Sequence, residues 1–435
     1  MTRPTDPRGA FLHDAIWHGN LTRAEALLAE HPELRSSDIH TAAVLGDAAA
    51  VRRFLAEDPA AIRSQAPPFG GEPLVYLCLS KYLRLDPART PGFLEAATAL
   101  LDAGANPNSG FWNEGEFETA LYGAAGVAHH AELTRLLLER GADPTDGEVL
   151  YHSPEGHDSR AMQLVVETGK LGAEHLHLML IRKLDWHDLE GARWLLEHGA
   201  SFARNAKWPA PLEHAIDRGN DLPTIQLLLD HGADPFRVEH EMTAVQRAAR
   251  KGRGDILTEL ERRNVPLVLE GLDRLLAACA RDDVARIRSL VGEAPGLVNE
   301  LLAQGGKLLG EFAISGNTAG VGQLLDLGVP IDARYPGYGY FGIARDSTAL
   351  HIAAWMLDRD TLTLLLQRGA PVNAKDANGS TPLALALKGC TESYWTEWRS
   401  LEPIKALLDA GATLDSVKYP SGYKEADDLL KERMS

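Results

Sequence analysis

The strongest constraint on the fold is a phrase that recurs along the chain. A leucine pair is followed by Gly-Ala and then by Asp or Asn with Pro, as in LLDAGANPN (100–108), LLERGADP (137–144), LLDHGADP (228–235) and LLQRGAPVN (365–373). A second phrase precedes these copies by about half a repeat, as in TALYGAA (119–125) and TALHIAA (348–354). Such self-similarity is the signature of a repeat architecture, in which one unit buries its apolar face only against its neighbours.

The two phrases resemble the ankyrin repeat, a unit of about 33 residues. Residues 348–354 match the family pattern Thr-Pro-Leu-His-x-Ala-Ala best, and Thr381-Pro382-Leu383 keeps its opening intact. The resemblance covers about residues 10–415 and implies an all-α solenoid of about twelve helix-turn-helix units in one curved, continuous domain. The expected helix pairs lie near 10–30, 38–57, 73–103, 119–140, 148–168, 177–198, 210–231, 243–263, 272–292, 307–327, 348–368 and 381–410.

Each unit also makes physical sense on its own. Thr348 and Thr381 can cap a first helix, and a glycine such as Gly252 can end it because glycine tolerates positive φ. Gly369 is expected to stop a second helix. We therefore expect a flexible amino terminus (1–9), the repeats (10–415) and a polar capping helix (424–433).

Composition excludes several classes of protein. Three cysteines in 435 residues are too few and too widely spaced for a disulfide scaffold or a zinc motif. No signal peptide or membrane-length apolar run is visible, and a net charge of −17 argues against nucleic-acid binding. We expect a cytoplasmic monomer without a cofactor or metal. The high Ala, Arg and Gly usage is typical of a GC-rich bacterial source.

Three insertions interrupt the repeats, and insertions in a solenoid often lie on its working face. They are residues 79–93, 333–347 and 388–400. The second is rich in tyrosine and glycine, and aromatic residues in turns add contact area at low entropic cost. Two interpretations stay open: either Tyr335, Tyr338, Tyr340 and Phe341 pack the turn back on the array, or they contact a partner.

A deeper break lies in the fifth and sixth units. Pro154 falls where a neighbouring unit has its first helix, so that helix should be short, shifted or irregular. Lys183 occupies a position that other units fill with alanine, such as Ala215 and Ala353. Because stacked helices lie about 8–10 Å apart, Lys183 should reach the 153–155 region of the preceding unit.

The resemblance also indicates a binding face, because ankyrin repeats usually bind through a concave surface of turn tips and first helices. Carried over to this chain, that face and its surroundings give twelve candidate residues for ligand or partner binding. They are Tyr122, His152, Glu155, His157, Lys183, Asp185, Trp186, Asp217, Arg218, Trp355, Tyr338 and Tyr340.

Three interpretations of the cluster at residues 122–188 compete. Lys183 could form a structural ion pair with Glu155 or Asp185, since buried charges need partners. It could instead anchor a small ligand in a polar pocket, with Trp186 as a stacking wall. Catalysis by Glu155, Asp185, His152 or Lys183 as general acids or bases is the third. The leading hypothesis is a noncatalytic scaffold that binds a protein partner through the concave face and the long turns.

Other polar groups look structural. His129-His130 and the pair His175 and His177 have poor helical spacing for a metal site, so a solvated face is expected. His351 should donate a structural hydrogen bond to the neighbouring turn. Arg247, Arg250, Lys251 and Arg253 form a basic patch that Asp255, Glu259 and Glu261 should compensate.

Overall fold

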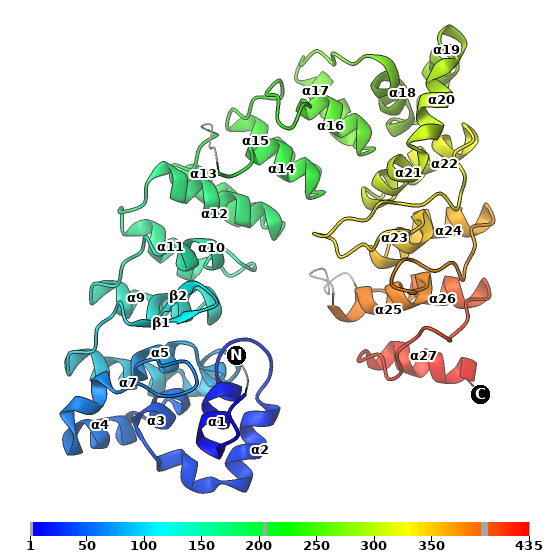
Figure 1. The fold of residues 1–435 in the computed structure, drawn as a ribbon. Helices are drawn as coiled ribbons and strands as arrows, with labels where there is room; N and C mark the ends of the chain where they lie inside the picture. Colours follow the sequence, from blue (N-terminus) through cyan, green and yellow to red (C-terminus); the bar gives the residue numbers. More distant parts are fainter. Residues whose placement is uncertain (1–2, 203–206, 393–398, 435) are drawn as a thin grey trace. The chain divides into compact units, whose positions relative to one another are not determined.

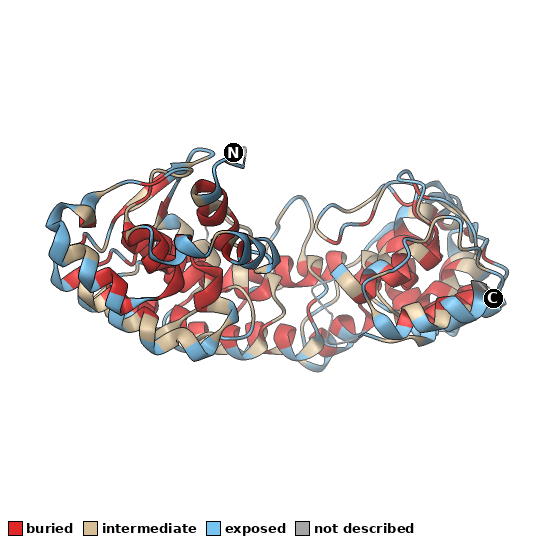
Figure 2. Ribbon diagram, turned by 90° about the horizontal axis from the view of Figure 1, so that it is seen from below, coloured by how far each residue is buried: buried red, intermediate tan, exposed pale blue. Residues whose placement is uncertain are grey.

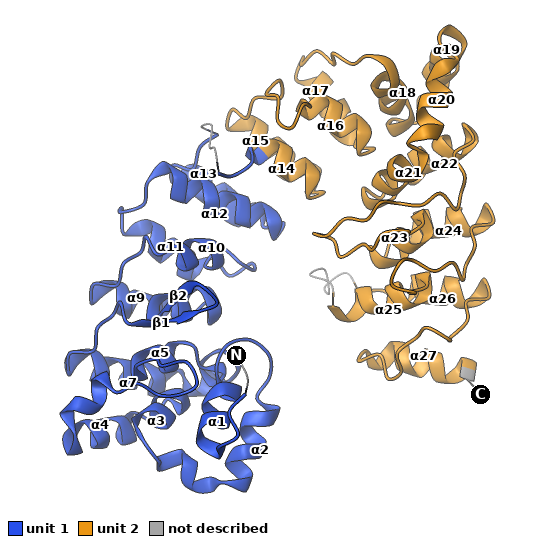
Figure 3. Cartoon of the chain, in the orientation of Figure 1, with its two compact units in different colours: residues 1–211 blue, residues 212–435 orange. Residues whose placement is uncertain are grey.

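A computed structural model describes residues 3–202, 207–392 and 399–434. The chain divides into two compact units, residues 1–211 and residues 212–435 (Figure 3). Within the described ranges, regular structure is helical apart from one two-stranded antiparallel sheet. The expectation of an all-α class is therefore confirmed with that small exception.

The first unit contains short helices that follow one another in pairs (Figure 1). Its α-helices are α1 (Pro7–Ala15), α2 (Thr22–Glu30), α3 (Ile39–Leu45), α4 (Ala48–Glu57), α5 (Pro73–Cys78), α6 (Lys81–Leu85), α7 (Thr90–Asp102), α8 (Ala120–Tyr122), α9 (Ala131–Glu139), α10 (Gly147–His152), α11 (Arg160–Glu167), α12 (Ala173–Asp185) and α13 (Leu189–Glu197). Strands β1 (Gly110–Asn113) and β2 (Glu116–Thr119) precede α8. Shorter 3₁₀ or π turns span Pro32–Ser36, Pro59–Arg63, Pro87–Arg89 and Gly123–Val127.

The second unit continues in the same manner. Its helices are α14 (Pro211–Asp217), α15 (Leu222–Asp230), α16 (Ala244–Arg250), α17 (Gly254–Arg262), α18 (Gly271–Ala280), α19 (Val284–Glu293), α20 (Gly296–Ala303), α21 (Gly305–Ile314), α22 (Thr318–Asp326), α23 (Ala349–Trp355), α24 (Arg359–Gln367), α25 (Pro382–Glu392), α26 (Glu402–Asp409) and α27 (Lys424–Met434). Helix α27 occupies the segment for which a capping helix was expected.

Apolar side chains form the core between neighbouring pairs. Helix α23 packs on α21 and α25, and α24 packs on α22 and α26, so first helices contact first helices and second helices contact second helices. Figure 2 shows buried residues on the inner faces of the helices and exposed residues along the outside. One helix pair alone could not cover these apolar faces.

Helix ends follow the chemistry expected from sequence. Gly219, Gly252 and Gly316 have φ between 67° and 72° at the ends of first helices, and Gly369 has φ 83° after α24, as predicted. The Nε2 of His351 lies 3.1 Å from the carbonyl oxygen of Ser380, which confirms its structural hydrogen bond. The prediction that His177 lies on a solvated face was wrong. This residue is buried, and its Nε2 lies 2.9 Å from the carbonyl oxygen of Pro209.

Four local features differ from or refine the expectations. The first is the β1–β2 hairpin, and the second is α20, an additional helix between α19 and α21. Within the 79–93 insertion, Lys81–Leu85 forms the short helix α6. Helix α1 begins at Pro7, inside the expected flexible terminus, because the Asp6 side chain accepts a hydrogen bond from the Gly9 amide. The short helix predicted before Pro154 is confirmed, because α10 ends at His152.

Across the described part of the chain, none of the helices has the length and apolar character that crossing a bilayer requires.

Candidate functional site

Lys183, on α12 of the first unit, is part of a buried ion pair. Its side chain is fully buried, with Nζ 2.7 Å from Asp188 Oδ2 and 3.0 Å from the carbonyl oxygen of Gly156. The prediction that Lys183 pairs with Glu155 or Asp185 was therefore wrong. Asp188 caps α13 through the Gly191 amide, and the absent side chain of Gly191 leaves room for the aliphatic stem of Lys183. Lys183, which was predicted to anchor a ligand, is thus engaged in contacts within the fold.

Arg182, the residue before Lys183, contacts the two predicted carboxylates. Its Nη2 lies 2.6 Å from Glu155 Oε1 and its Nη1 lies 2.6 Å from Asp185 Oδ2. The same guanidinium covers the ring of Tyr151, 4.0 Å from the centroid. Because Glu155 belongs to the turn after α10, this interaction joins α12 to the preceding helix pair where that pair is irregular.

His152 completes the polar group around Glu155. Its Nδ1 lies 3.1 Å from Glu155 Oε1, its Nε2 lies 3.4 Å from Glu148 Oε2, and its ring centroid lies 5.3 Å from that of Tyr122. Burial raises the pKa of Glu155, but hydrogen bonds from His152 and Arg182 outweigh burial and lower this pKa below its usual value. Glu155 therefore stays ionised and is poorly suited to donate a proton.

The other predicted residues of this cluster lie at its margin. Trp186 is half-buried at the end of α12. His157 is exposed and lines a separate hollow with residues of α11 and α13. The structure thus brings together Tyr122, His152, Glu155 and Asp185, while Lys183 and His157 face other neighbours.

Four predicted residues from distant parts of the second unit converge. Tyr338 Oη accepts a hydrogen bond from Arg218 Nη1 at 3.1 Å and donates one to the carbonyl oxygen of Asp217 at 3.3 Å. The Arg218 guanidinium also lies over the ring of Tyr340, 3.6 Å from its centroid. Both residues contacted by the tyrosines lie at the end of α14, so the long turn reaches back to that helix.

This turn has an ordered backbone. Antiparallel bridges join Tyr335 to Ser347 and Tyr338 to Ile343, and we call residues 335–347 the aromatic hairpin. At its base, the buried Tyr335 donates a hydrogen bond to Glu311 Oε1 at 3.0 Å and packs closely on Gly310. Phe341 is also buried. The packing interpretation therefore holds for Tyr335 and Phe341, whereas Tyr338 and Tyr340 are half-buried.

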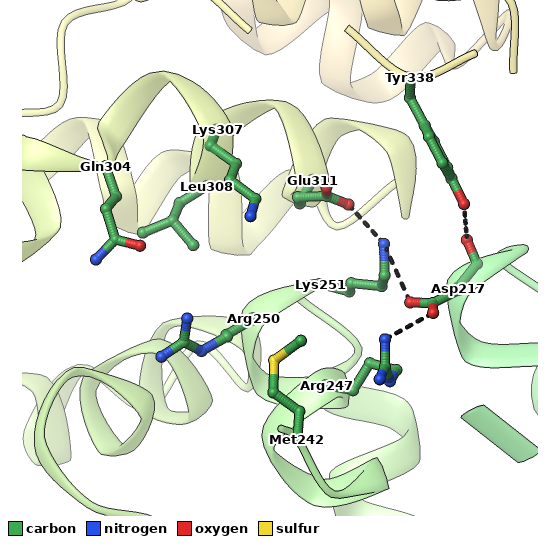
Figure 4. A pocket seen from close by; sticks show the side chains of 10 residues that line it. All are labelled: Asp217, Met242, Arg247, Arg250, Lys251, Gln304, Lys307, Leu308, Glu311 and Tyr338. Atoms are coloured by element: carbon green, nitrogen blue, oxygen red, sulfur yellow. Dashed lines mark hydrogen bonds and ion pairs between the residues drawn. The ribbon is translucent and has the colours of Figure 1, made fainter. Parts of the chain in front are cut away.

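Beside the aromatic hairpin lies a cavity of about 250 Å³ (Figure 4). It opens between α16 and α21, and its lining residues are Asp217, Met242, Arg247, Arg250, Lys251, Gln304, Lys307, Leu308, Glu311 and Tyr338. Asp217 and Tyr338 were predicted from sequence. Lys307 and Glu311 were missed, because α16 and α21 become neighbours only through the fold: 60 residues separate Lys251 from Glu311.

An ion-pair network forms one wall of this cavity. Lys251 Nζ lies 2.9 Å from Glu311 Oε2 and 3.6 Å from Asp217 Oδ1, and Arg247 Nη1 lies 2.6 Å from Asp217 Oδ2. Burial lowers the pKa of Lys251, but Glu311 and Asp217 outweigh burial and raise it above its usual value. The wall therefore contains both positive and negative side chains, and the ion pairs between them fix their positions.

The basic patch expected to be compensated locally is compensated mainly by other residues. Only Arg253 uses a predicted partner, Asp255, at 2.7 Å. Arg250 pairs instead with Asp273 at 2.7 Å, and Glu259 pairs with Arg262 and Arg263. The expectation of a solvated strip was wrong because α16 turns Arg247 and Lys251 toward α14 and α21.

Two further predictions concern the end of the second unit. Trp355 is 8% exposed and packs under the Lys388 ammonium, so it does not lie open on the surface. Residues 393–398 of the predicted 388–400 insertion lie outside the described residues. Among the residues that are described, no group of three or more His, Cys, Asp or Glu side chains has the arrangement of a metal site.

Comparison with known proteins identifies one repeat. Residues 345–377, which include α23 and α24, match the ankyrin repeat family. The chain is also 42% identical over 83 residues to serine/threonine-protein kinase 12 of Arabidopsis thaliana, a match that covers 19% of the chain and 16% of that protein. The chain thus spans about a sixth of the length of this curated relative. The ankyrin resemblance of residues 348–368 is confirmed.

Proposed function

We propose that this protein is a noncatalytic scaffold that binds a protein partner through its first helices and long turns. The observation that carries the proposal is the cavity between α16 and α21 beside the aromatic hairpin. Ankyrin repeats imply protein partners, and the matched repeat contributes the end of the aromatic hairpin. Concave sites with an apolar part and a few placed polar groups are typical of binding sites.

The proposal extends the matched repeat to the whole chain. We propose about twelve ankyrin units over residues 10–415 in a single array, with α27 as a polar cap. The succession of helix pairs in both units, with glycines of positive φ at corresponding ends, supports this extension. The same proposal includes a monomeric state, a cytoplasmic location and a bacterial source.

A small-ligand or catalytic pocket at residues 122–188 is the second candidate. What favours it is the half-buried His152 between two carboxylates and beside the Tyr122 ring. What disfavours it is that Lys183, Glu155 and Asp185 are already engaged in ion pairs. Structural ion-pair networks also perturb pKa values, so these paired groups need no catalytic role to explain them.

The scaffold proposal is tested by affinity capture from cells that express the protein naturally. The baits are the full chain and three variants: Met242→Asp and Lys307→Glu at the cavity, and Arg288→Glu on the exposed side of α19 as the matched control. We expect a protein that is retained by the wild type and by Arg288→Glu but lost from both cavity variants. Equal retention by all four baits, or no retained protein, would contradict the proposal.

A further inference from the structure

The hydrogen-bonding capacity of the cavity is unevenly used. Of its ten lining residues, four are Arg or Lys (Arg247, Arg250, Lys251 and Lys307) and two are acidic (Asp217 and Glu311). The acidic side chains are engaged: Asp217 contacts Arg247 and Lys251, and Glu311 contacts Lys251 and Tyr335. The cavity therefore has few acceptor sites left for a ligand.

The basic side chains, in contrast, still have N–H groups available for a ligand. Arg247 is 5% exposed, and its buried Nε has no hydrogen-bond partner among the described residues. Arg250 uses Nε for Asp273, while its side chain stays 39% exposed. Lys307 is exposed, and no ion pair is found for it within the described ranges. Arg247 Nε is enclosed, so the donors open to a ligand are those of Arg250 and Lys307, and these two cations favour a ligand that accepts charge-assisted hydrogen bonds.

The geometry of the cavity further restricts which ligands can bind. Arg250 and Lys307 lie on opposite sides of the space between α16 and α21, and Met242 and Leu308 add apolar surface to the same lining (Figure 4). An anion between two cationic side chains gains charge-assisted hydrogen bonds, while an apolar stem can cover the Met and Leu side chains. A volume of about 250 Å³ is sufficient for a side chain and too small for a folded element.

We propose that this cavity binds a carboxylate on an apolar stem, held by Arg250 and Lys307 with the stem on Met242 and Leu308. The inference rests on the proposed scaffold function if the carboxylate belongs to a partner protein. The same chemistry would accept a free aliphatic diacid. An acidic ligand for a chain of net charge −17 implies recognition by short-range contacts in the cavity rather than by the field of the whole protein.

Calorimetric titration of the full-length chain distinguishes a carboxylate of a partner protein from a free diacid. The probes are the acetylated and amidated peptide Leu-Glu-Leu-Glu-Leu, its counterpart with glutamine in place of glutamate, and glutarate. The proteins are the wild type, Arg250→Ala, Lys307→Ala and the matched control Arg288→Ala, each checked for an unchanged melting temperature. If Arg250→Ala melts early because Asp273 loses its partner, Lys307→Ala carries the test.

A protein carboxylate is indicated if the acidic peptide binds at least about tenfold more tightly than the glutamine peptide. Lys307→Ala should then weaken binding about tenfold and Arg288→Ala should not. Binding of glutarate alone, with the same response to the variants, supports the carboxylate site with a free diacid as its source. Equal binding of both peptides, or no binding of any probe, overturns the inference. Equal peptide binding together with partner loss in Met242→Asp would overturn the carboxylate and leave the scaffold standing.

Discussion

Arg218 Nη1 donates a hydrogen bond to Tyr338 Oη at 3.1 Å, and 120 residues separate the two positions. Arg218 follows α14, whereas Tyr338 belongs to the aromatic hairpin before α23. The hairpin therefore reaches past α16 and α21 and contacts a helix several pairs earlier in the same unit. This long-range contact places Tyr338 at the cavity.

Removing the Tyr338 hydroxyl should loosen the aromatic hairpin. Tyr338→Phe loses the hydrogen bonds with Arg218 and the Asp217 carbonyl, which corresponds to about 1 kcal/mol in the free energy of unfolding. Amide hydrogen exchange should quicken in residues 335–347, and Tyr419→Phe, on an exposed ring, serves as the control. Unchanged exchange in the hairpin would show that these hydrogen bonds do not hold it.

The base of the aromatic hairpin depends on a glycine. A Cβ at Gly310 would lie 2.2 Å from the ring of Tyr335, so Gly310→Ala should lower the free energy of unfolding by about 1–3 kcal/mol. The matched control is Gly322→Ala in α22, where the nearest atom would lie 3.8 Å away. That change should be neutral or stabilising by up to about 1 kcal/mol, because alanine favours a helix. Similar urea midpoints for the two variants would refute the close packing.

The buried ion pair of the first unit should be structural. Lys183→Met leaves the Asp188 carboxylate buried beside an apolar side chain, and we expect a loss of about 3 kcal/mol or more. Lys170→Met, at an exposed position, should change stability by less than about 0.5 kcal/mol. Urea unfolding followed by circular dichroism measures both. A fully stable Lys183→Met protein would return Lys183 to the candidates for ligand binding.

Stability should depend on pH through a carboxyl group of the β1–β2 hairpin. Burial raises the pKa of Glu118 to about 7 from its ordinary 4.5, so the folded chain retains a proton that the unfolded chain has released. The stabilisation that this bound proton contributes is fully present below pH 4.5, and it is lost as the pH rises through about 7.

Glu118→Gln should therefore lose about 2–3 kcal/mol less stability than the wild type between pH 5 and 8. Glu116→Gln, at an exposed position of the same strand, should follow the wild type. Thermal melts across this pH range measure the difference. Parallel pH profiles for the wild type and Glu118→Gln would contradict the raised pKa.

The helices were largely predictable because their signals are local. Thr348, Gly252 and Pro154 act on the backbone within one turn of their own positions, and the structure has a helix start, a helix end and a short helix there. The β1–β2 hairpin was missed since its apolar alternation is brief. Helix α20 carries no repeat phrase to mark it.

The contacts of the candidate sites were less predictable because they depend on which neighbouring helix a side chain faces. Lys183 was expected beside Glu155, but α12 directs it toward Asp188, while Arg182 takes Glu155. A change of one residue in a helix turns a side chain by about 100°, so spacing alone could not decide between them. Glu311 and Tyr335 meet through tertiary packing, which no local pattern records.

The most direct test of the scaffold places a photoreactive amino acid at position 307, in the cavity, and in a parallel protein at position 288, on α19. After irradiation in cells, we predict one protein adduct that forms from position 307, disappears in the Met242→Asp background and is absent from position 288. The same adducts from both positions, or an adduct from position 307 that persists in Met242→Asp, would contradict partner binding in the cavity.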